Sequence, residues 1–316
     1  MKVAILGAGA LGSLIGARLA LHGHDVQLLM RNPVHLEAIR ENGLALTMAG
    51  VTQTVPIRAC LPSDAVEPVD LVVLLTKTYQ SDKALQDATH LLRAGTAVLS
   101  LQNGLGNADR IAAHVPLPQI YIGISMMPAD LTGPGQVSTQ GAGHTRFYSA
   151  DGTDRPFAHE IGAAFNAAQM ACEVDTQIQT AIWEKAAFNA ASNALLGLTG
   201  TTPGALLECP QAMALAQDIA TEALAIARAS GIAVMASRVT DLLTLSSQKH
   251  PNHRPSMAQD IAAKRQTEVD AINGAFVHHA SLQGQTAPLN QTIWTIVKLA
   301  ETGFAPQVTS LKGNSL

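Results

Sequence analysis

The chain has 316 residues, of which 47% are hydrophobic and 14% are charged, and its formal net charge is −4. This composition excludes a disordered chain, and the small negative charge predicts no basic surface for nucleic acid or for an anionic membrane. No apolar run reaches the ~18 residues that a membrane-spanning helix needs. The length favours two domains over a single core.

The cysteine and histidine residues predict neither a disulfide framework nor a metal centre. Cys60, Cys172 and Cys209 are widely spaced and form no CxxC pair, so we expect reduced, buried thiols in a cytoplasmic protein. The start of the chain lacks the basic segment and the cleavage site of a signal peptide. The histidines of 250–253 and 278–279 have no cysteine or carboxylate ligands at zinc spacing, so we expect no metal site.

The N-terminal stretch has the pattern of a strand, a turn and a helix that bind a dinucleotide. Lys2–Leu6 is a short apolar run that suits a buried parallel strand, and a helical pattern extends to Leu21. Between them lies a GxGxxG motif that consists of Gly7, Ala8, Gly9, Ala10, Leu11 and Gly12. The first glycine makes the tight turn, the second lets the backbone approach a pyrophosphate, and the third allows close packing. The position between strand and helix favours this interpretation over a glycine-rich turn without a ligand.

The second strand predicts which dinucleotide is bound. Asp25–Met30 ends at Arg31, where NAD-binding domains of this type carry an acid for the ribose 2′-hydroxyl. No acid follows before Glu37, and a guanidinium suits the 2′-phosphate of NADP(H). Asn32–Pro33 then predicts the N-cap and the first residue of a helix, which Gly43 ends.

Two further strands lead into polar loops. Asp70–Leu75 precedes Lys77, and Thr96–Leu101 precedes Asn103. Alone, Lys77 would be an ordinary surface lysine and Asn103 a turn residue. Open α/β sheets bind ligands outside the carboxyl ends of their strands, and this shared edge favours a role in the site for both.

The rest of the chain divides into a mixed part and a helical part. Before residue 176 we expect a hairpin over 44–59 with its turn at Gly50, a helix over 81–93, strands over 120–125 and 145–149 around a Gly/Pro-rich connection at 132–135, a helix over 157–169 and a strand over 171–174. From Gln177 onward we expect only helices, near 179–197, 210–230, 236–248, 265–283 and 288–302. The sequence therefore predicts a Rossmann-type α/β domain over 1–176 and an all-α domain over 177–316.

One helix of the second domain carries an unusual polar stripe. Lys185, Asn189 and Asn193 are spaced at i, i+4 and i+8, so they advance about 40° per step and extend over roughly 12 Å. A solvated face is the common alternative, but such faces usually carry Glu, Lys and Arg, whereas two amides bring hydrogen-bonding groups without charge. The stripe thus favours the lining of a polar pocket.

Together these motifs resemble the ketopantoate reductase (2-dehydropantoate 2-reductase) family. The matching segments are Gly7–Gly12, Arg31, Leu75–Lys77, Gln102–Gly106, Trp183–Asn193, Ser256–Asp260 and Thr267–Gly274. They cover nearly the whole chain in order, and the WxKxxxNxxxN and SMxQDI…TExDxING blocks are specific in combination. The resemblance implies the reduction of 2-dehydropantoate to pantoate by NADPH, in pantothenate and coenzyme A biosynthesis.

The resemblance also implies a role for individual residues. Lys185 matches the catalytic lysine of the family and Glu268 its acidic partner. The positions that contact the substrate match Asn189, Asn193 and Ser256, and those that line the cofactor and substrate cleft match Lys77 and Asn103. Hydride delivery builds negative charge on the former carbonyl oxygen, so an ammonium suits both proton donation and charge stabilisation. Alternatively, Glu268 is only an acid in the first turn of a helix.

The joint assignment of Ser256 and Glu268 makes a structural prediction. One straight helix through both would separate them by about 18 Å, too far to share a small substrate. Ser256 with Gln259, and Thr267 with Asp270, each have the pattern of a capping box. We therefore expect an interruption between Ser256 and Glu268, and a new helix that starts near Thr267.

The sequence departs from the family at one position and leaves alternatives open. Pro203 lies where the family often has a further Asn that contacts the substrate. A reductase of the same family that acts on another 2-oxo acid is therefore an alternative. A second is a non-catalytic NADPH-binding sensor, which the presence of Lys185 and Glu268 disfavours. The apolar helical domain is compatible with a homodimer.

Overall fold

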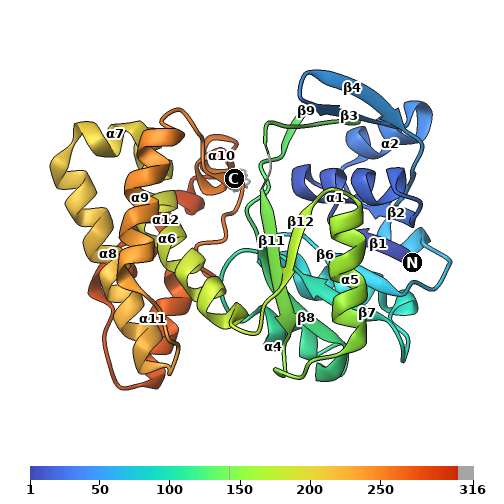
Figure 1. The fold of residues 1–316 in the computed structure, drawn as a ribbon. Coiled ribbons are helices and arrows are strands. Elements are labelled where there is room, and N and C mark those ends of the chain that lie inside the picture. Colours follow the sequence, from blue (N-terminus) through green and yellow to red (C-terminus); the bar gives the residue numbers. More distant parts are fainter. Residues whose placement is uncertain (142, 305–316) are drawn as a thin grey trace, which may run out of the picture. The chain divides into compact units, whose positions relative to one another are not determined.

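The computed structural model describes residues 1–141 and 143–304, which form two compact units divided between Ile182 and Trp183. The first unit is an α/β domain with a parallel sheet, and the second consists of helices, so the predicted fold class is confirmed (Figure 1). Helix α6 (Ile178–Thr199) runs across the division, and it begins two residues beyond the predicted boundary at residue 176. In the described part of the chain, no helix is long and apolar enough to cross a membrane.

The first unit is built on an eight-stranded sheet. Its strands, in spatial order, are β12 (Ala171–Val174), β11 (His144–Ser149), β8 (Ile120–Ser125), β7 (Ala97–Ser100), β6 (Leu71–Leu74), β1 (Lys2–Leu6), β2 (Asp25–Leu29) and β5 (Arg58–Cys60). All neighbouring strands are parallel except β11 and β8. Seven of these strands were predicted and are confirmed, with ends that differ by at most one residue, whereas β5 lies at the end of the stretch that was expected to be a hairpin.

Both faces of this sheet are buried, which explains why its strands are continuously apolar. In β1, Val3 and Ile5 face one core, while Ala4 and Leu6 face the other. Helices α1 (Ala10–Leu21), α2 (Pro33–Asn42) and α5 (Pro156–Ala167) contribute to the first core. Helices α3 (Ser81–Asp87) and α4 (Asn107–Ala112) and the first turn of α6 contribute to the second. Because neither face of these strands contacts solvent, polar and apolar residues do not alternate along them, as expected for a parallel sheet between helices.

The predicted start and end of α2 are confirmed. The Asn32 side chain accepts hydrogen bonds from the backbone N–H groups of Val34 and His35, and Pro33 is the first helical residue. Gly43 ends the helix with a φ of 73°, a left-handed conformation that favours glycine. Arg31 is therefore held between a buried strand and a capped helix.

A second, four-stranded sheet packs on the first core and was predicted only in part. Its order is β4 (Val51–Val55), β3 (Leu44–Met48), β10 (Gln136–Thr139) and β9 (Asp130–Gly133). The expected hairpin of β3 and β4 is confirmed. The stretch around 132–135 was expected to be a connection but forms the β9–β10 hairpin, with Gly135 at its turn. Its pairing partner β3 lies about ninety residues earlier, so no local pattern marks it.

The second unit holds the rest of α6 and six further helices within the described residues: α7 (Pro203–Glu208), α8 (Pro210–Ala229), α9 (Ala236–Lys249), α10 (Ser256–Ala262), α11 (Asn273–Leu282) and α12 (Pro288–Thr302). Helices α6, α8, α9 and α12 confirm the prediction. The short helix α7 was not predicted, α10 was indicated only by the capping-box pattern at Ser256, and α11 begins at Asn273 rather than at residue 265.

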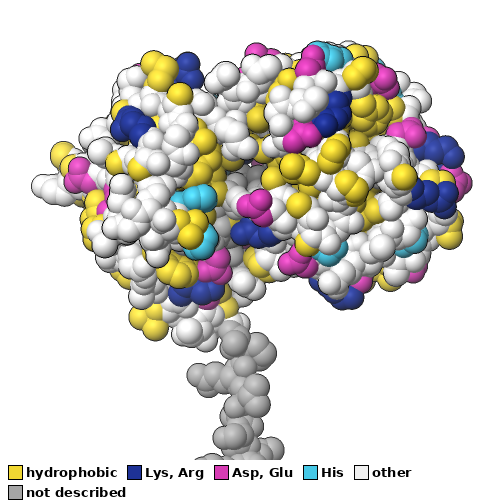
Figure 2. Space-filling view, turned by 90° about the horizontal axis from the view of Figure 1, so that it is seen from below, with side chains coloured by type: hydrophobic (Ala, Val, Ile, Leu, Met, Phe, Trp, Pro, Cys, Tyr) yellow, Lys and Arg dark blue, Asp and Glu magenta, His cyan; other side chains and the backbone are white. Residues whose placement is uncertain are grey.

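Glutamates on neighbouring helices satisfy backbone groups that local caps leave open. Glu184 of α6 accepts from the N–H of Met235 at the start of α9, over 2.9 Å. Glu222 of α8 accepts from the N–H of Asn290 at the start of α12, over 2.8 Å. A carboxylate at a helix N-terminus is favourable because it meets free N–H groups and the positive end of the dipole. Figure 2 shows one face of the protein, where acidic and basic side chains lie interspersed.

Candidate functional site

Four loops of the first unit lie together at the carboxyl edge of the main sheet. They follow β7, β6, β1 and β2, which lie side by side in this order in the sheet. Backbone bonds continue past the strand ends, from Leu75 N–H to Leu6 O over 2.8 Å and from Leu101 N–H to Leu74 O over 3.3 Å. The glycine loop and the residues Arg31, Lys77 and Asn103 are thereby brought to one edge, where sheets of this kind bind ligands.

The three glycines of the loop have different surroundings. A Cβ on Gly7, whose φ is 105°, would lie 2.4 Å from the backbone N of Thr76, and one on Gly12 would lie 2.5 Å from Gly7 O. A Cβ on Gly9 would meet no atom within 4 Å. Gly9 also starts α1, and no side chain caps this helix. The first and third glycines thus allow close packing, while the second leaves free space at an uncapped helix N-terminus, which fits a pyrophosphate.

Arg31 lies beside two other charged groups. Its guanidinium donates to Asp87 over 2.5 Å, and Lys83 donates to the other carboxylate oxygen, also over 2.5 Å. Lys83, and after it Arg31, hold the pKa of the Asp87 carboxyl below its usual value. The exposed group therefore carries two positive charges and one negative charge, which leaves a net attraction for a phosphate.

Gln102 links the loops that carry Lys77 and Asn103. This buried carboxamide donates to the backbone oxygen of Thr76 over 2.7 Å and to Ser81 Oγ over 2.8 Å. The sequence placed Gln102 in a motif but gave it no role. A glutamine at the end of a buried strand does not by itself predict a linking role, because its partners Thr76 and Ser81 are distant in sequence.

The polar stripe of α6 is not a solvated face. Asn189 is 7% exposed and Asn193 is 5% exposed, and Lys185 is partly buried. The alanines that flank the stripe, Ala186, Ala187, Ala190, Ala191 and Ala194, are fully buried or nearly so. The two amides and the ammonium thus lie in largely apolar surroundings, where a hydrogen-bonding partner is strongly favoured.

The surroundings of Lys185 change its acidity. Burial lowers the pKa of Lys185 to about 8, against the opposing effect of the Glu268 carboxylate, which raises it. Glu268 is itself 6% exposed. A lysine near this pKa can give up its proton close to neutral pH, which is the property expected of a general acid.

The predicted interruption between Ser256 and Glu268 is confirmed, but the new helix expected near Thr267 starts six residues later. Helix α10 ends at Ala262, and α11 begins only at Asn273. The intervening segment is anchored twice: the buried Asp260 accepts from Arg265 over 3.0 and 3.1 Å, and the Thr267 hydroxyl and N–H donate to Glu301 over 2.7 and 2.8 Å. Glu268 therefore lies in a turn whose position is fixed from both sides.

Neither predicted capping box forms. Ser256 is the first residue of α10, and Pro255, which precedes it, makes no side-chain cap. The Thr267 hydroxyl accepts from Val269 N–H, two residues on rather than three, and Asp270 forms an ion pair with α12 instead. The segment before Asn273 is therefore a non-helical turn, although a helix was expected from residue 265. Side chains of α12 bind the polar groups of Thr267 and Asp270 that the capping box would have used.

Buried amides join the Glu268 turn to α6. Asn273 follows the turn and donates to Ala190 O of α6 over 3.1 Å and to Asn290 Oδ1 over 3.0 Å. Asn290 in turn donates to Glu222 over 2.8 Å. Ala190 lies between the two stripe amides, so this network fixes the turn relative to the stripe.

Ser256 and Pro203 lie at helix starts near the far end of α6. The backbone of Ala258 in α10 approaches Gly197, where a Cβ would be 3.4 Å from Ala258 Cα. The start of α10, with the exposed Ser256, thus lies against α6 beyond Asn193. Pro203 is buried as the first residue of α7, a position that proline favours.

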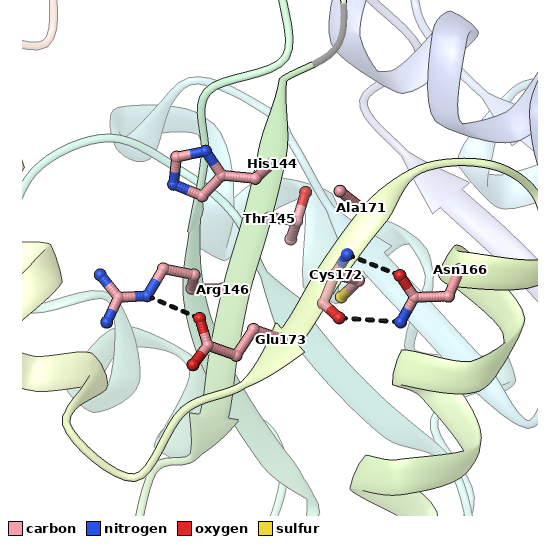
Figure 3. Close-up of a pocket in the computed structure, with 7 residues that line it drawn as sticks. All are labelled: His144, Thr145, Arg146, Asn166, Ala171, Cys172 and Glu173. Carbon is pink, nitrogen blue, oxygen red and sulfur yellow. Dashed lines mark hydrogen bonds and ion pairs between the residues drawn. The ribbon is translucent and has the colours of Figure 1, made fainter.

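A separate cavity of about 460 Å³ lies at the β11–β12 edge of the sheet. Figure 3 shows that Arg146 reaches Glu173 and that the Asn166 carboxamide pairs with the backbone of Cys172. Burial, and then Glu173, raise the pKa of the Cys172 thiol to about 12, so it stays protonated. None of the predicted site residues lines this cavity. In the described residues, no group of three or more His, Cys, Asp or Glu side chains is arranged to hold a metal ion.

Comparison with known proteins gives matches along nearly the whole chain. Residues 3–152 match the family model "Ketopantoate reductase PanE/ApbA", and residues 177–301 match the model of its C-terminal domain. A 2-dehydropantoate 2-reductase of Pyrococcus horikoshii is 36% identical over 303 residues, covering 96% of this chain and 98% of that protein. One from Streptococcus pyogenes is 32% identical, covering 95% and 98%.

Solved structures agree with the sequence matches and add a different substrate. A ternary structure of D-mandelate dehydrogenase with NADH and anilino(oxo)acetate has a TM-score of 0.92 at 31% identity, covering 96% of this chain and 99% of that one. A PanE/ApbA family ketopantoate reductase from Ralstonia eutropha has a TM-score of 0.89 at 30% identity, covering the same shares. A nicotinamide dinucleotide is thus bound in a close structural relative.

The glycine loop gives a matched pair of variants. Gly9→Ala places a methyl group in free space, so we expect unchanged stability but a dinucleotide Kd raised about tenfold or more, since the methyl group occupies the approach of the pyrophosphate. Gly12→Ala forces a methyl group against Gly7 O and should lower the free energy of unfolding by about 1–3 kcal/mol. Fluorescence titration with NADPH and thermal unfolding measure the two effects. Unchanged NADPH binding by Gly9→Ala would contradict the assignment of the loop.

Proposed function

The chain belongs to the ketopantoate reductase family, and from this premise we propose that it reduces 2-dehydropantoate to pantoate with NADPH, in pantothenate and coenzyme A biosynthesis. The observation that carries the proposal is the partly buried Lys185, whose pKa is lowered to about 8 beside the buried amides of α6. An ordinary structural lysine would keep its charge in water, because burial of an ammonium is costly. This arrangement supports the chemistry that the family name describes.

The residues of the second unit have a division of labour in this proposal. A bound reduced nicotinamide supplies the hydride. The Lys185 ammonium stabilises the negative charge that develops on the substrate's 2-oxo oxygen and donates a proton to that oxygen. Glu268 holds Lys185 in its charged form until the proton is transferred. Asn189, Asn193 and Ser256 donate hydrogen bonds to the hydroxyl and carboxylate groups that distinguish the substrate.

The cofactor proposal rests on the first unit. The glycine loop takes the pyrophosphate, Lys77 and Asn103 lie at the same sheet edge, and Arg31 takes the 2′-phosphate. The free space at Gly9 and the uncapped start of α1 fit the pyrophosphate. An acid at position 31 would favour NADH, whereas a guanidinium favours NADPH.

A second candidate is the reduction of another 2-oxo acid. Two observations favour it: Pro203 starts a helix where the family often has an amide, and a D-mandelate dehydrogenase has a TM-score of 0.92 to this chain. Without that amide, the substrate's end distant from the 2-oxo group would be held differently. The chemistry of Lys185 is the same for both candidates.

We propose further that the protein acts in the cytoplasm as a homodimer. All three cysteines are free thiols, which suits a reducing compartment. The expectation that they are buried was wrong, because Cys209 is exposed and Cys60 and Cys172 are half-buried. In the second unit, the exposed Leu282 and Leu299, at 70% and 69%, are compatible with a contact between two copies. Sedimentation velocity at micromolar concentration tests the dimer, and a purely monomeric protein would refute it.

A panel of 2-oxo acids with NADPH tests the reaction. We expect kcat/KM for ketopantoate to exceed that for branched and aromatic 2-oxo acids by at least about tenfold. A preference of this size for an aromatic acid such as phenylglyoxylate would favour the second candidate. A protein that binds NADPH but turns over no 2-oxo acid would refute both and support a sensor.

The choice of dinucleotide depends on Arg31. Arg31→Ala should raise KM for NADPH about tenfold or more and leave KM for NADH nearly unchanged, because only NADPH loses a charge-assisted contact. Arg58→Ala is the control, since Arg58 is also an exposed, ion-paired arginine but pairs with Asp25 at the other end of β2. Equal weakening of both dinucleotides by Arg31→Ala would refute the assignment.

The lowered pKa of Lys185 predicts the pH dependence. The reduction rate should fall as pH rises through about 8, where the ammonium loses its proton. Glu268→Gln removes the group that raises this pKa, so the fall in rate should move to lower pH.

Lys185→Met should reduce kcat about 10²–10⁴-fold at unchanged NADPH affinity. The lowered pKa also predicts stability: between about pH 8 and 10.4 the folded state binds fewer protons at Lys185 than the unfolded chain, so the melting temperature of wild type relative to that of Lys185→Met should rise across this range.

The rate profiles of wild type and Glu268→Gln between pH 6 and 10 measure these effects. A rate that stays constant to pH 10, or a fall that moves to higher pH in Glu268→Gln, would contradict the role of the pair.

A further inference from the structure

The glycine loop is connected to distant segments through two buried side chains. Ser13, in the second turn of α1, is 0% exposed, and His35, in the first turn of α2, is 3% exposed. We infer that Ser13 and His35 are positioning residues, which hold the glycine loop in the conformation that receives the dinucleotide. This inference rests on the proposed use of a nicotinamide dinucleotide.

A continuous series of hydrogen bonds runs through these side chains. The backbone N–H of Gly135, in the β9–β10 turn, donates to His35 Nδ1 over 2.9 Å. His35 Nε2 lies 3.1 Å from Ser13 Oγ, and Ser13 Oγ donates to Ala8 O over 3.3 Å. The series ends on the carbonyl between the first two glycines of the motif. It therefore joins the second sheet, α2 and the glycine loop.

The donor and the acceptor of each hydrogen bond in the series follow from the first bond, between Gly135 and His35. A backbone N–H is only a donor, so His35 Nδ1 must accept and the ring proton must lie on Nε2. Nε2–H then donates to Ser13 Oγ, which leaves the hydroxyl proton for Ala8 O. Burial lowers the pKa of His35, which keeps the ring in this neutral form. Every donor in the series thus has one acceptor.

The series restrains the peptide that precedes the free space at Gly9. Ala8 O is held by Ser13, and the N–H of Gly9 donates to Gly7 O over 2.8 Å, so both polar groups of the Ala8–Gly9 peptide are engaged. This fixes the orientation of the loop from which α1 starts. A loop already in its binding conformation loses less entropy when the ligand binds.

The series also joins two parts of the proposed dinucleotide site. His35 lies four residues after Arg31, on the helix that Asn32 caps. The bond to Ser13 therefore ties the segment proposed for the 2′-phosphate to the loop proposed for the pyrophosphate. An apolar pair of the same volume would pack without the cost of burying polar groups. Two buried polar side chains here specify an orientation, which apolar contacts do not.

Three variants test the inference through the Kd for NADPH, KM, kcat and the melting temperature. Ser13→Ala breaks the bond to Ala8 O and should raise the Kd and KM for NADPH about three- to tenfold, with kcat at saturation changed by less than about twofold. His35→Asn can still accept from Gly135 but is too short to reach Ser13, so it should resemble Ser13→Ala. His35→Gln can reach Ser13 with an N–H donor and should restore most of the affinity.

Thr96→Val is the matched control for a lost buried hydroxyl. The Thr96 hydroxyl shares its one proton between Val69 O and Leu91 O, 2.8 and 3.0 Å away, at the opposite end of the strands from the glycine loop. We expect Thr96→Val to lower the melting temperature and to leave the Kd for NADPH unchanged. If it weakens NADPH binding as much as Ser13→Ala does, loss of stability explains both and the inference is overturned.

Two other outcomes separate this inference from the proposed function. If wild type binds NADPH but Ser13→Ala and His35→Asn bind it within about twofold of wild type, the inference is overturned and the proposed function stands. If wild type binds neither NADPH nor NADH, the proposed function fails and the inference fails with it.

Discussion

An ammonium surrounded by alanines needs a fixed negative charge nearby, and in the second unit this charge is the Glu268 carboxylate. Burial alone would favour the neutral amine of Lys185, and the pKa of Lys185 would vary if the distance to the acid were not fixed. Much of the helical unit serves this requirement. The segment that carries Glu268 is interrupted, tied to α10 by Arg265 and to α12 by Thr267, and joined to α6 by Asn273. Directional bonds of this kind between buried polar groups specify one arrangement, although they add little net stability.

The first unit meets a different requirement, which is to bring backbone close to a large anionic ligand. Gly7 and Gly12 allow the strand, loop and helix to pack tightly, and Gly9 keeps the ligand side of the loop free. The hydrogen bonds through Ser13 and His35 restrain the same loop from the protein side. Both units therefore use buried side chains to hold a short segment that carries residues of the proposed site, which agrees with the general need to preorganise a site before its ligand binds.

Local patterns predicted much of the fold and of the candidate site. The capped start of α2, the glycine loop and the spacing of Lys185, Asn189 and Asn193 are local, and the structure has them as expected. The β9–β10 hairpin was missed because its stability comes from pairing with β3, far away in the chain. The capping box at Thr267 failed for a similar reason, since Glu301 of another helix accepts hydrogen bonds from the Thr267 hydroxyl and N–H. Gln102 and His35 have partners that are distant in sequence, so no spacing rule finds them.

The central claim is that Lys185 is a proton donor whose acidity is set by burial and by Glu268. Heteronuclear NMR of protein with isotope-labelled lysine follows the side-chain resonances of Lys185 through pH directly, with Lys185→Met to assign them. The account predicts a midpoint near pH 8 in wild type and a lower midpoint in Glu268→Gln. A midpoint near the ordinary lysine value of about 10.4 would contradict it.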